Sequence, residues 1–153
     1  MVFDSTCVGV IETHIVTATP HHSPTARVSA RELVGAILSQ AGAEVQTADG
    51  MAEGLTVFLA WRPDILISDL SMPDGDGFSL IRQIREREGA WHKRTPAIAL
   101  TAYAGAEDRI RSLAAGFQMH LPKPIEPSEL IVTIASLTGR LAQAQAQVLG
   151  ETV

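Results

Sequence analysis

The stretch Pro63-Asp64-Ile65-Leu66-Ile67-Ser68-Asp69 decides the fold class of this 153-residue chain. Its large apolar residues follow one another without the alternation of a half-exposed strand, which indicates a short strand buried on both faces. A second run of the same kind, Pro96-Ala97-Ile98-Ala99-Leu100-Thr101, lies further along the chain. Strands buried on both faces are typical of parallel sheets that are covered by helices on each side.

Segments with helical periodicity separate these two strands from shorter ones at residues 44–48 and 119–121. The first helix should bury one stripe of apolar residues: Ala30, Leu33, Val34, Ile37, Leu38 and Ala41. Strands that alternate with helices at this spacing predict right-handed βαβ units. We therefore expect an α/β fold, a doubly wound parallel five-stranded sheet with helices on both faces.

Three later helices carry expectations about which side chains face the core. The helix that follows Gly77 should turn its arginines outward: Arg82, Arg85 and Arg87. The helix over residues 107–115 should bury Ile110 and Leu113, because both belong to its apolar positions. A last helix begins near Pro127 and should bury Leu130, Ile134, Leu137 and Leu141.

The first strand of the sheet has to come from the N-terminal 27 residues. Residues 7–11 and residues 14–18 both have strand-like patterns, and the sequence does not choose between them. We therefore divide the chain into an atypical segment, 1–27, which supplies the first strand and a loop, and a core at 28–138. The remaining segment, 139–153, is of low complexity and either extends the last helix or forms a linker.

Composition restricts the classes of function. Twelve Lys and Arg residues against seventeen Asp and Glu residues give a net charge of −5, which argues against direct binding to nucleic acid or to an anionic membrane. The single cysteine, Cys7, excludes an internal disulfide and fits a reducing cytoplasm, the compartment that we expect. No apolar run reaches the roughly 18 residues that a membrane-spanning helix needs, so we expect no membrane insertion.

Three polar residues stand where successive strands of this sheet should end: Asp69, Thr101 and Lys123. Ligand sites in open α/β sheets lie outside the carboxyl ends of the strands, so we expect these side chains to converge. A carboxylate can attack phosphorus as a nucleophile. An ammonium group and a hydroxyl can then hold the phosphoryl oxygens. The arrangement therefore predicts a phosphoryl site.

The chain from about residue 28 to residue 138 resembles the receiver domain of two-component response regulators. Four stretches carry the resemblance, in the family's order: Pro63 to Pro73 (PDILISDLSMP), Asp76-Gly77-Phe78, Ala99-Leu100-Thr101-Ala102 and Leu121-Pro122-Lys123-Pro124. Within the family, the segment is most similar to receivers associated with hybrid sensor histidine kinases. The resemblance implies the flavodoxin-like receiver fold, and it also leads us to expect a cis peptide bond between Lys123 and Pro124.

The resemblance also implies a role for each site residue. Asp69 would be the phospho-acceptor, and Thr101 and Lys123 would bind the phosphoryl group. His120 occupies the position of the family's switch residue, where an aromatic side chain is commoner, and a simply packed histidine is the alternative. Mg²⁺ would be the cofactor, bound by Asp69 and by the backbone carbonyl of Ser71.

One departure from the family concerns the acidic pair that holds Mg²⁺ at the end of the first strand. No residue from Thr13 to Arg31 is acidic, and the nearest upstream carboxylate is Glu12. Glu12 could serve as a ligand only if residues 7–11 form the first strand. Otherwise the chain is a pseudo-receiver, or its first residues are not those of the natural reading frame. Because Mg²⁺ is usually held by one or two carboxylates together with phosphate oxygens, we expect weak binding of the metal.

The leading interpretation is a phosphorelay receiver, a phosphoprotein of signal transduction that changes conformation and is not a turnover enzyme. Its partner would be a histidine kinase or a histidine phosphotransfer protein, with a weak homodimer as a further contact to test. The alternative is a pseudo-receiver that acts as a phosphorylation-independent interaction module. A dehalogenase-like phosphatase fits less well, because Ser71 stands where that family has a second Asp. The histidines His14, His21 and His22 and the loop Asp74-Gly75-Asp76-Gly77 are weaker candidates for metal sites.

Overall fold

The computed structural model describes residues 14–18, 30–72, 75–90, 94–102 and 105–137, and all structural statements concern these ranges. A five-stranded sheet has the strand order β2-β1-β3-β6-β7, and all its pairs are parallel. Its strands are β1 (His14–Ala18), β2 (Glu44–Ala48), β3 (Ile65–Asp69), β6 (Ala97–Thr101) and β7 (Met119–Pro122). The predicted doubly wound α/β fold is confirmed.

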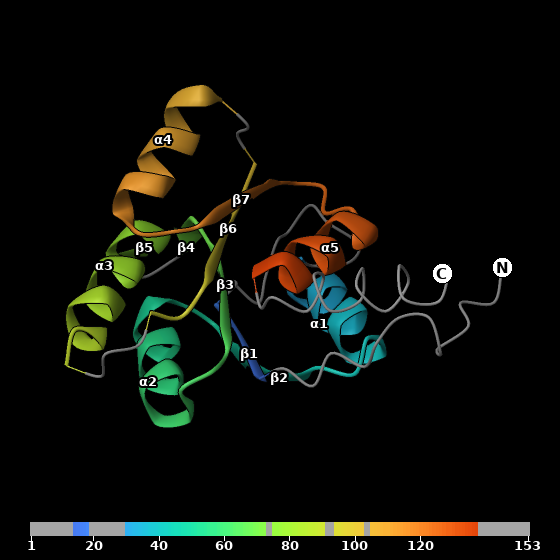
Figure 1. Ribbon diagram of the computed structural model, residues 1–153, viewed down its shortest axis with the longest axis horizontal. Helices are drawn as coiled ribbons and strands as arrows, with labels where there is room; N and C mark the ends of the chain where they lie inside the picture. The colour runs from blue at the N-terminus through green and yellow to red at the C-terminus, as the bar shows by residue number, and fades with distance from the viewer. Residues whose placement is uncertain (1–13, 19–29, 73–74, 91–93, 103–104, 138–153) are drawn as a thin grey trace, which may run out of the picture.

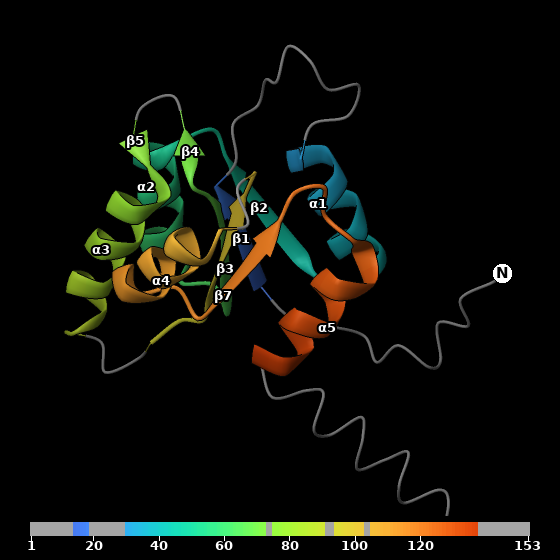
Figure 2. The ribbon, with the colours of Figure 1, turned by 90° about the horizontal axis from the view of Figure 1, so that it is seen from above.

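Five helices cover the two faces of the sheet. They are α1 (Ala30–Gln40), α2 (Met51–Trp61), α3 (Gly77–Glu88), α4 (Ala106–Ala115) and α5 (Pro127–Leu137). Figure 2 shows α1 and α5 on one face and α2, α3 and α4 on the other. A two-stranded hairpin, β4 (Ser71–Met72) with β5 (Gly75–Asp76), lies between β3 and α3 and was not predicted.

The two central runs of the sequence are buried as expected. Every residue of β3 and of β6 is buried, and each strand sends alternate side chains into one of two cores. Ile65 and Ile67 pack among residues of α1 and α5, whereas Leu66 packs among residues of α2 and α3. Burial on both faces explains why these strands lack the alternation of a half-exposed strand.

The structure also decides which N-terminal segment enters the sheet. Residues 14–18 form β1, and this strand lies between β2 and β3 (Figure 1). Its register places Ala18 beside both Ala48 and Ser68. The other candidate, residues 7–11, lies outside the described residues, as do most of the segment 1–27 and the whole segment 139–153. No helix in the described part of the chain is long and apolar enough to cross a membrane.

Two expectations about helix faces are wrong. Ile110 and Leu113 of α4 are 67% and 45% exposed, and Leu33 of α1 is 36% exposed. The helix α4 packs against α3 and β7, but it does so through small residues: Ser112 is fully buried and Ala115 is half-buried. Periodicity identified the apolar stripe correctly. It could not show that the helix is rotated so that the stripe points away from the core.

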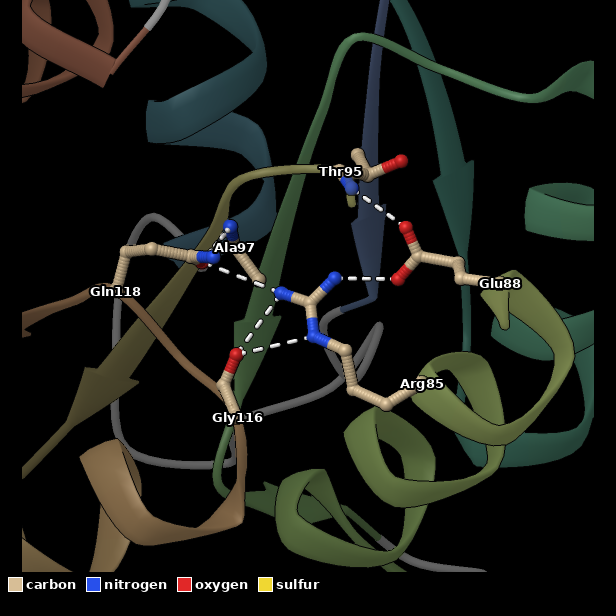
Figure 3. Close-up of polar contacts among 6 residues, drawn as sticks. All are labelled: Arg85, Glu88, Thr95, Ala97, Gly116 and Gln118. Atoms are coloured by element: carbon tan, nitrogen blue, oxygen red, sulfur yellow. Dashed lines mark hydrogen bonds and ion pairs between the residues drawn. The ribbon is translucent and has the colours of Figure 1, made fainter. Parts of the chain in front are cut away.

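Arg85 of α3 points inward, contrary to the expectation that all three arginines face outward (Figure 3). Its Nε and Nη2 both donate hydrogen bonds to the carbonyl oxygen of Gly116, at 3.1 and 2.8 Å. Its Nη2 also donates to Oε1 of Gln118 at 3.2 Å, and its Nη1 pairs with Oε1 of Glu88. Burial lowers the pKa of the Arg85 guanidinium, and the neighbouring Glu88 carboxylate opposes this effect.

The partners of Arg85 extend this network to the sheet. Glu88 is buried, and its Oε2 accepts a hydrogen bond from the backbone N–H of Thr95, just before β6 (Figure 3). The Oε1 of Gln118 accepts a second bond, 2.7 Å long, from the backbone N–H of Ala97. The network therefore joins α3, the C-terminal end of α4 and the amino ends of β6 and β7. It lies at the edge of the sheet opposite to the strand ends that carry the predicted site.

Candidate functional site

Parallel strands bring the three predicted site residues to one edge of the sheet. Asp69 is the last residue of β3, Thr101 is the last residue of β6, and Lys123 directly follows β7. The register pairs Asp69 with Leu100 and Thr101 with Pro122, so each strand end lies about one residue from its neighbour's. Since parallel strands are about 4.8 Å apart, these ends form a compact group, as the sequence predicted.

Asp69 and Lys123 form an ion pair between Oδ2 and Nζ. The carboxylate side chain is only 5% exposed and the lysine side chain is 30% exposed, so Lys123 reaches from the surface to a nearly buried partner. The backbone N–H of Lys123 donates to the carbonyl oxygen of Thr101 at 2.7 Å, which fixes the start of the β7–α5 loop. The Lys123–Pro124 peptide bond is cis, so that prediction is confirmed.

The second carboxylate oxygen of Asp69 is also bound. Its Oδ1 accepts a hydrogen bond, 3.1 Å long, from the backbone N–H of Ser71. Ser71 belongs to the short hairpin, so the unpredicted hairpin is what positions this donor. Both carboxylate oxygens of Asp69 therefore have a partner among the described residues.

Two further residues hold the loop that follows Asp69. A Cβ added to Gly77 would lie 2.5 Å from the carbonyl oxygen of Asp69, so only glycine fits at this close approach of two backbones. Asp76 caps α3 by accepting a 2.7 Å hydrogen bond from the backbone N–H of Ser79. This bond lowers the pKa of the Asp76 carboxyl below its ordinary value, and partial burial opposes it. Asp76, which the sequence placed in a weaker candidate metal site, therefore serves as a helix cap.

Thr101 and His120 lie on neighbouring strands, as expected, with His120 opposite Ala99. Thr101 is buried at 5% exposure. Within the described ranges, Nε2 of His120 is buried and has no hydrogen-bond partner. His120 also lines a surface hollow together with Arg109 and Leu113 of α4 and Met119.

Sequence reasoning missed Thr17 of β1. This residue is fully buried, and its hydroxyl has no partner among the residues that the structure describes. It lies one position before Ala18, at the carboxyl end of the strand that borders β3. The available signal was a hydroxyl among the apolar residues Ile15, Val16 and Ala18.

Acidic residues are scarce around Asp69. The carboxyl end of β1 carries Thr17 and Ala18, and no residue from 19 to 29 is acidic. The described ranges contain no group of three or more His, Cys, Asp or Glu side chains that could hold a metal ion. Since β1 begins at His14, the condition set for Glu12, a strand over residues 7–11, is not the arrangement observed. Glu12 itself lies outside the described residues, as do Asp4, Asp74, His21 and His22, and so does the side chain of His14.

Comparisons with known proteins agree with this geometry. A model of the response regulator receiver domain family matches residues 27–135. An uncharacterized 14.6 kDa protein of Leptolyngbya boryana is 44% identical over 101 residues, which cover 66% of this chain and 76% of that protein. The hybrid signal transduction histidine kinase D of Dictyostelium discoideum is 44% identical over 78 residues, half of this chain but only 5% of the kinase.

A solved structure extends the comparison to the fold. The receiver domain of the sensor histidine kinase PA1611 from Pseudomonas aeruginosa PAO1 superposes with a TM-score of 0.71 at 28% identity. The superposition covers 84% of this chain and 98% of that domain. The PA1611 domain was solved with a magnesium ion coordinated in its active site cleft.

Proposed function

Because the chain belongs to the response regulator receiver domain family of two-component signalling, we propose that Asp69 is its phospho-acceptor. The observation that carries this proposal is the ion pair between Asp69 and Lys123 at the carboxyl edge of the sheet. It joins a nearly buried nucleophilic carboxylate to a cation that remains in contact with solvent. A phosphoryl donor can therefore approach a site whose charge is already compensated.

The proposed step transfers one phosphoryl group from a phosphohistidine to Asp69. A carboxylate oxygen of Asp69 forms the new P–O bond while the P–N bond of the donor breaks, and the imidazole leaves and takes up a proton. Lys123 neutralises the charge of the phosphoryl oxygens, and the Thr101 hydroxyl donates a hydrogen bond to one of them. Positioning and charge compensation provide the acceleration. The family serves signalling and not metabolic turnover, and the modified Asp69 is itself the product.

The family resemblance also implies a Mg²⁺ site. The resemblance implies Mg²⁺ bound by Asp69, the carbonyl of Ser71 and, at the end of the first strand, an acidic side chain for which Glu12 was the candidate. Mg²⁺ requires near-octahedral oxygen coordination and gives up its water reluctantly. Both carboxylate oxygens of Asp69 already have partners, and the described end of β1 adds no carboxylate. The described residues therefore do not fit a dedicated Mg²⁺ site, and the proposed phosphoryl transfer to Asp69 involves no metal ion.

The donor is proposed to be a histidine kinase or a histidine phosphotransfer protein in the cytoplasm. The chain spans only part of several relatives, so the output of the parent system stays open to test, as do the expected lack of direct nucleic-acid binding and the expected weak homodimer. The comparisons do not favour the phosphorylation-independent module over the phosphorelay function.

Intact-protein mass spectrometry after incubation with acetyl phosphate tests the proposal. We expect the chain to gain the mass of one phosphoryl group and the D69N variant to gain none. The matched control is D64N, which removes an exposed carboxylate just before the amino end of the same strand and should leave labelling unchanged. Labelling that persists in D69N, or an unlabelled wild-type chain, would contradict the assignment.

A further inference from the structure

We propose that the Asp69 site is phosphorylated without a divalent cation, and that Lys123 alone supplies the positive charge on which the reaction depends. The inference rests on the proposed function and concerns the cofactor requirement of the same site. The observed bounds of β1 and the positions of acidic residues along the chain support it.

The first step is the position of β1. A metal that bridges Asp69 and a neighbouring carboxylate needs that carboxylate at the carboxyl end of the adjacent strand, because only this end reaches the same edge of a parallel sheet. β1 runs from His14 to Ala18, and Ala18 pairs with Ser68, the residue before Asp69. The sequence has no acidic residue from 19 to 29. In the sequence, Glu12 comes two residues before His14, the first residue of β1.

The second step concerns the strands on either side of Asp69. On one side β1 ends in Thr17 and Ala18, and on the other side β6 ends in Thr101. The next strand outward, β2, is followed by Asp49, but that residue is exposed, and its backbone N–H donates to Oε2 of Glu53 at 3.1 Å. Among the described residues of β1, β3 and β6, Asp69 is therefore the single carboxylate at this edge.

The charge balance of the Asp69 site also disfavours a divalent cation. One carboxylate and one ammonium group give the pair Asp69–Lys123 no net charge. A divalent cation would have to lose water for one carboxylate whose charge Lys123 already balances, which is unfavourable for an ion that is usually held by one or two carboxylates together with phosphate oxygens. The ammonium group has three donors, so it can bind Oδ2 of Asp69 and a phosphoryl oxygen at the same time. Lys123 can thus bind at the site both before and after Asp69 is phosphorylated.

Two measurements test the inference. The first is labelling by acetyl phosphate in excess EDTA and in 10 mM Mg²⁺ (about tenfold above a millimolar affinity). In this reaction Asp69 forms the P–O bond and acetate leaves. We expect the two rates to agree within about twofold. The K123M variant should be labelled at least about tenfold more slowly than wild type in both buffers, and K123R should recover part of the lost rate. The matched charge control is R87M, on the exposed end of α3, which should be labelled at the wild-type rate.

The second measurement is a titration of the unmodified protein with Mg²⁺, followed by amide NMR. We expect no saturable shifts near Asp69 at millimolar concentration. Saturable shifts that disappear in D69N would overturn the inference, as would labelling more than about tenfold slower in EDTA. Both results would leave Asp69 as the phospho-acceptor. Failure of the proposed function looks different, because the wild-type chain would then stay unlabelled in either buffer.

Discussion

Arg85 and Gly116, which are far apart in the chain, are joined by two hydrogen bonds from one guanidinium to one carbonyl oxygen. The carbonyl belongs to the residue that ends α4, so the side chain of α3 fixes the point at which α4 turns into β7. Glu88 and Gln118 hold the same guanidinium from two other sides. A single half-buried cation thereby connects α3 to the C-terminal end of α4 and to the segment before β7.

The R85M variant should lower the free energy of unfolding by about 3 kcal/mol, because it leaves the buried carboxylate of Glu88 without its ion-pair partner. Urea denaturation measures this change. The control R87M, on the same helix but exposed, should stay within about 0.5 kcal/mol of wild type. Adding E88Q to R85M should cost less than the sum of the single changes. Additive losses would mean that the two side chains do not act as one network.

The G77A variant should destabilise the protein by about 1–3 kcal/mol and slow the labelling of Asp69, because its Cβ would displace the backbone at Asp69. The matched control is G35A. Gly35 lies inside α1, and a Cβ there meets no atom within 4 Å, so alanine should stabilise the helix by about 0.5–1 kcal/mol. Thermal unfolding and acetyl phosphate labelling compare the two variants. A neutral G77A would show that the hairpin can move away without cost.

Asp76 should contribute to stability only where it is ionised. Its folded pKa lies below its ordinary value because the Ser79 N–H binds the charged form. The contribution is therefore complete above the unfolded pKa, near pH 4, and disappears as the pH falls through the lowered folded pKa. D76A should cost about 1 kcal/mol at pH 7 through loss of the cap. D76N keeps a capping oxygen and should lose less stability than wild type between pH 5 and pH 2, roughly the range in which Asp titrates. Equal acid sensitivity of wild type and D76N would contradict this.

Phosphorylation of Asp69 should change the amide NMR shifts of α4 and β7, because the Thr101 hydroxyl is drawn toward the phosphoryl group and the neighbouring His120 then finds new space. T101V keeps the shape of the side chain and removes the hydroxyl. It should still be labelled, but shifts between residues 106 and 121 should be smaller than in wild type. Shifts that stay confined to Asp69 and its loop in the wild-type protein would rule out this switch.

Much of the site could be predicted from the sequence because parallel strands impose a simple rule. Two uninterrupted apolar runs identified β3 and β6, and the polar residue that ends each of them had to lie at the same edge. Lys123 was placed beside Asp69 by the same rule and by the family resemblance. The ion pair and the cis Lys123–Pro124 bond agree with these expectations.

The choice of the first strand was beyond the sequence, because residues 7–11 and 14–18 have the same local preference and pairing with β2 and β3 decides between them. The sequence also did not determine which faces of α3 and α4 are buried, for a related reason. Periodicity places Ile110, Leu113 and Arg85 on their helices, but the neighbouring elements decide which stripe is covered. Arg85 is turned inward because oxygens of Gly116, Glu88 and Gln118 accept the hydrogen bonds that a half-buried guanidinium needs there. The order of residues thus determined the sheet and which edge carries Asp69, Thr101 and Lys123, whereas long-range packing and hydrogen bonding decided which helix side chains are buried.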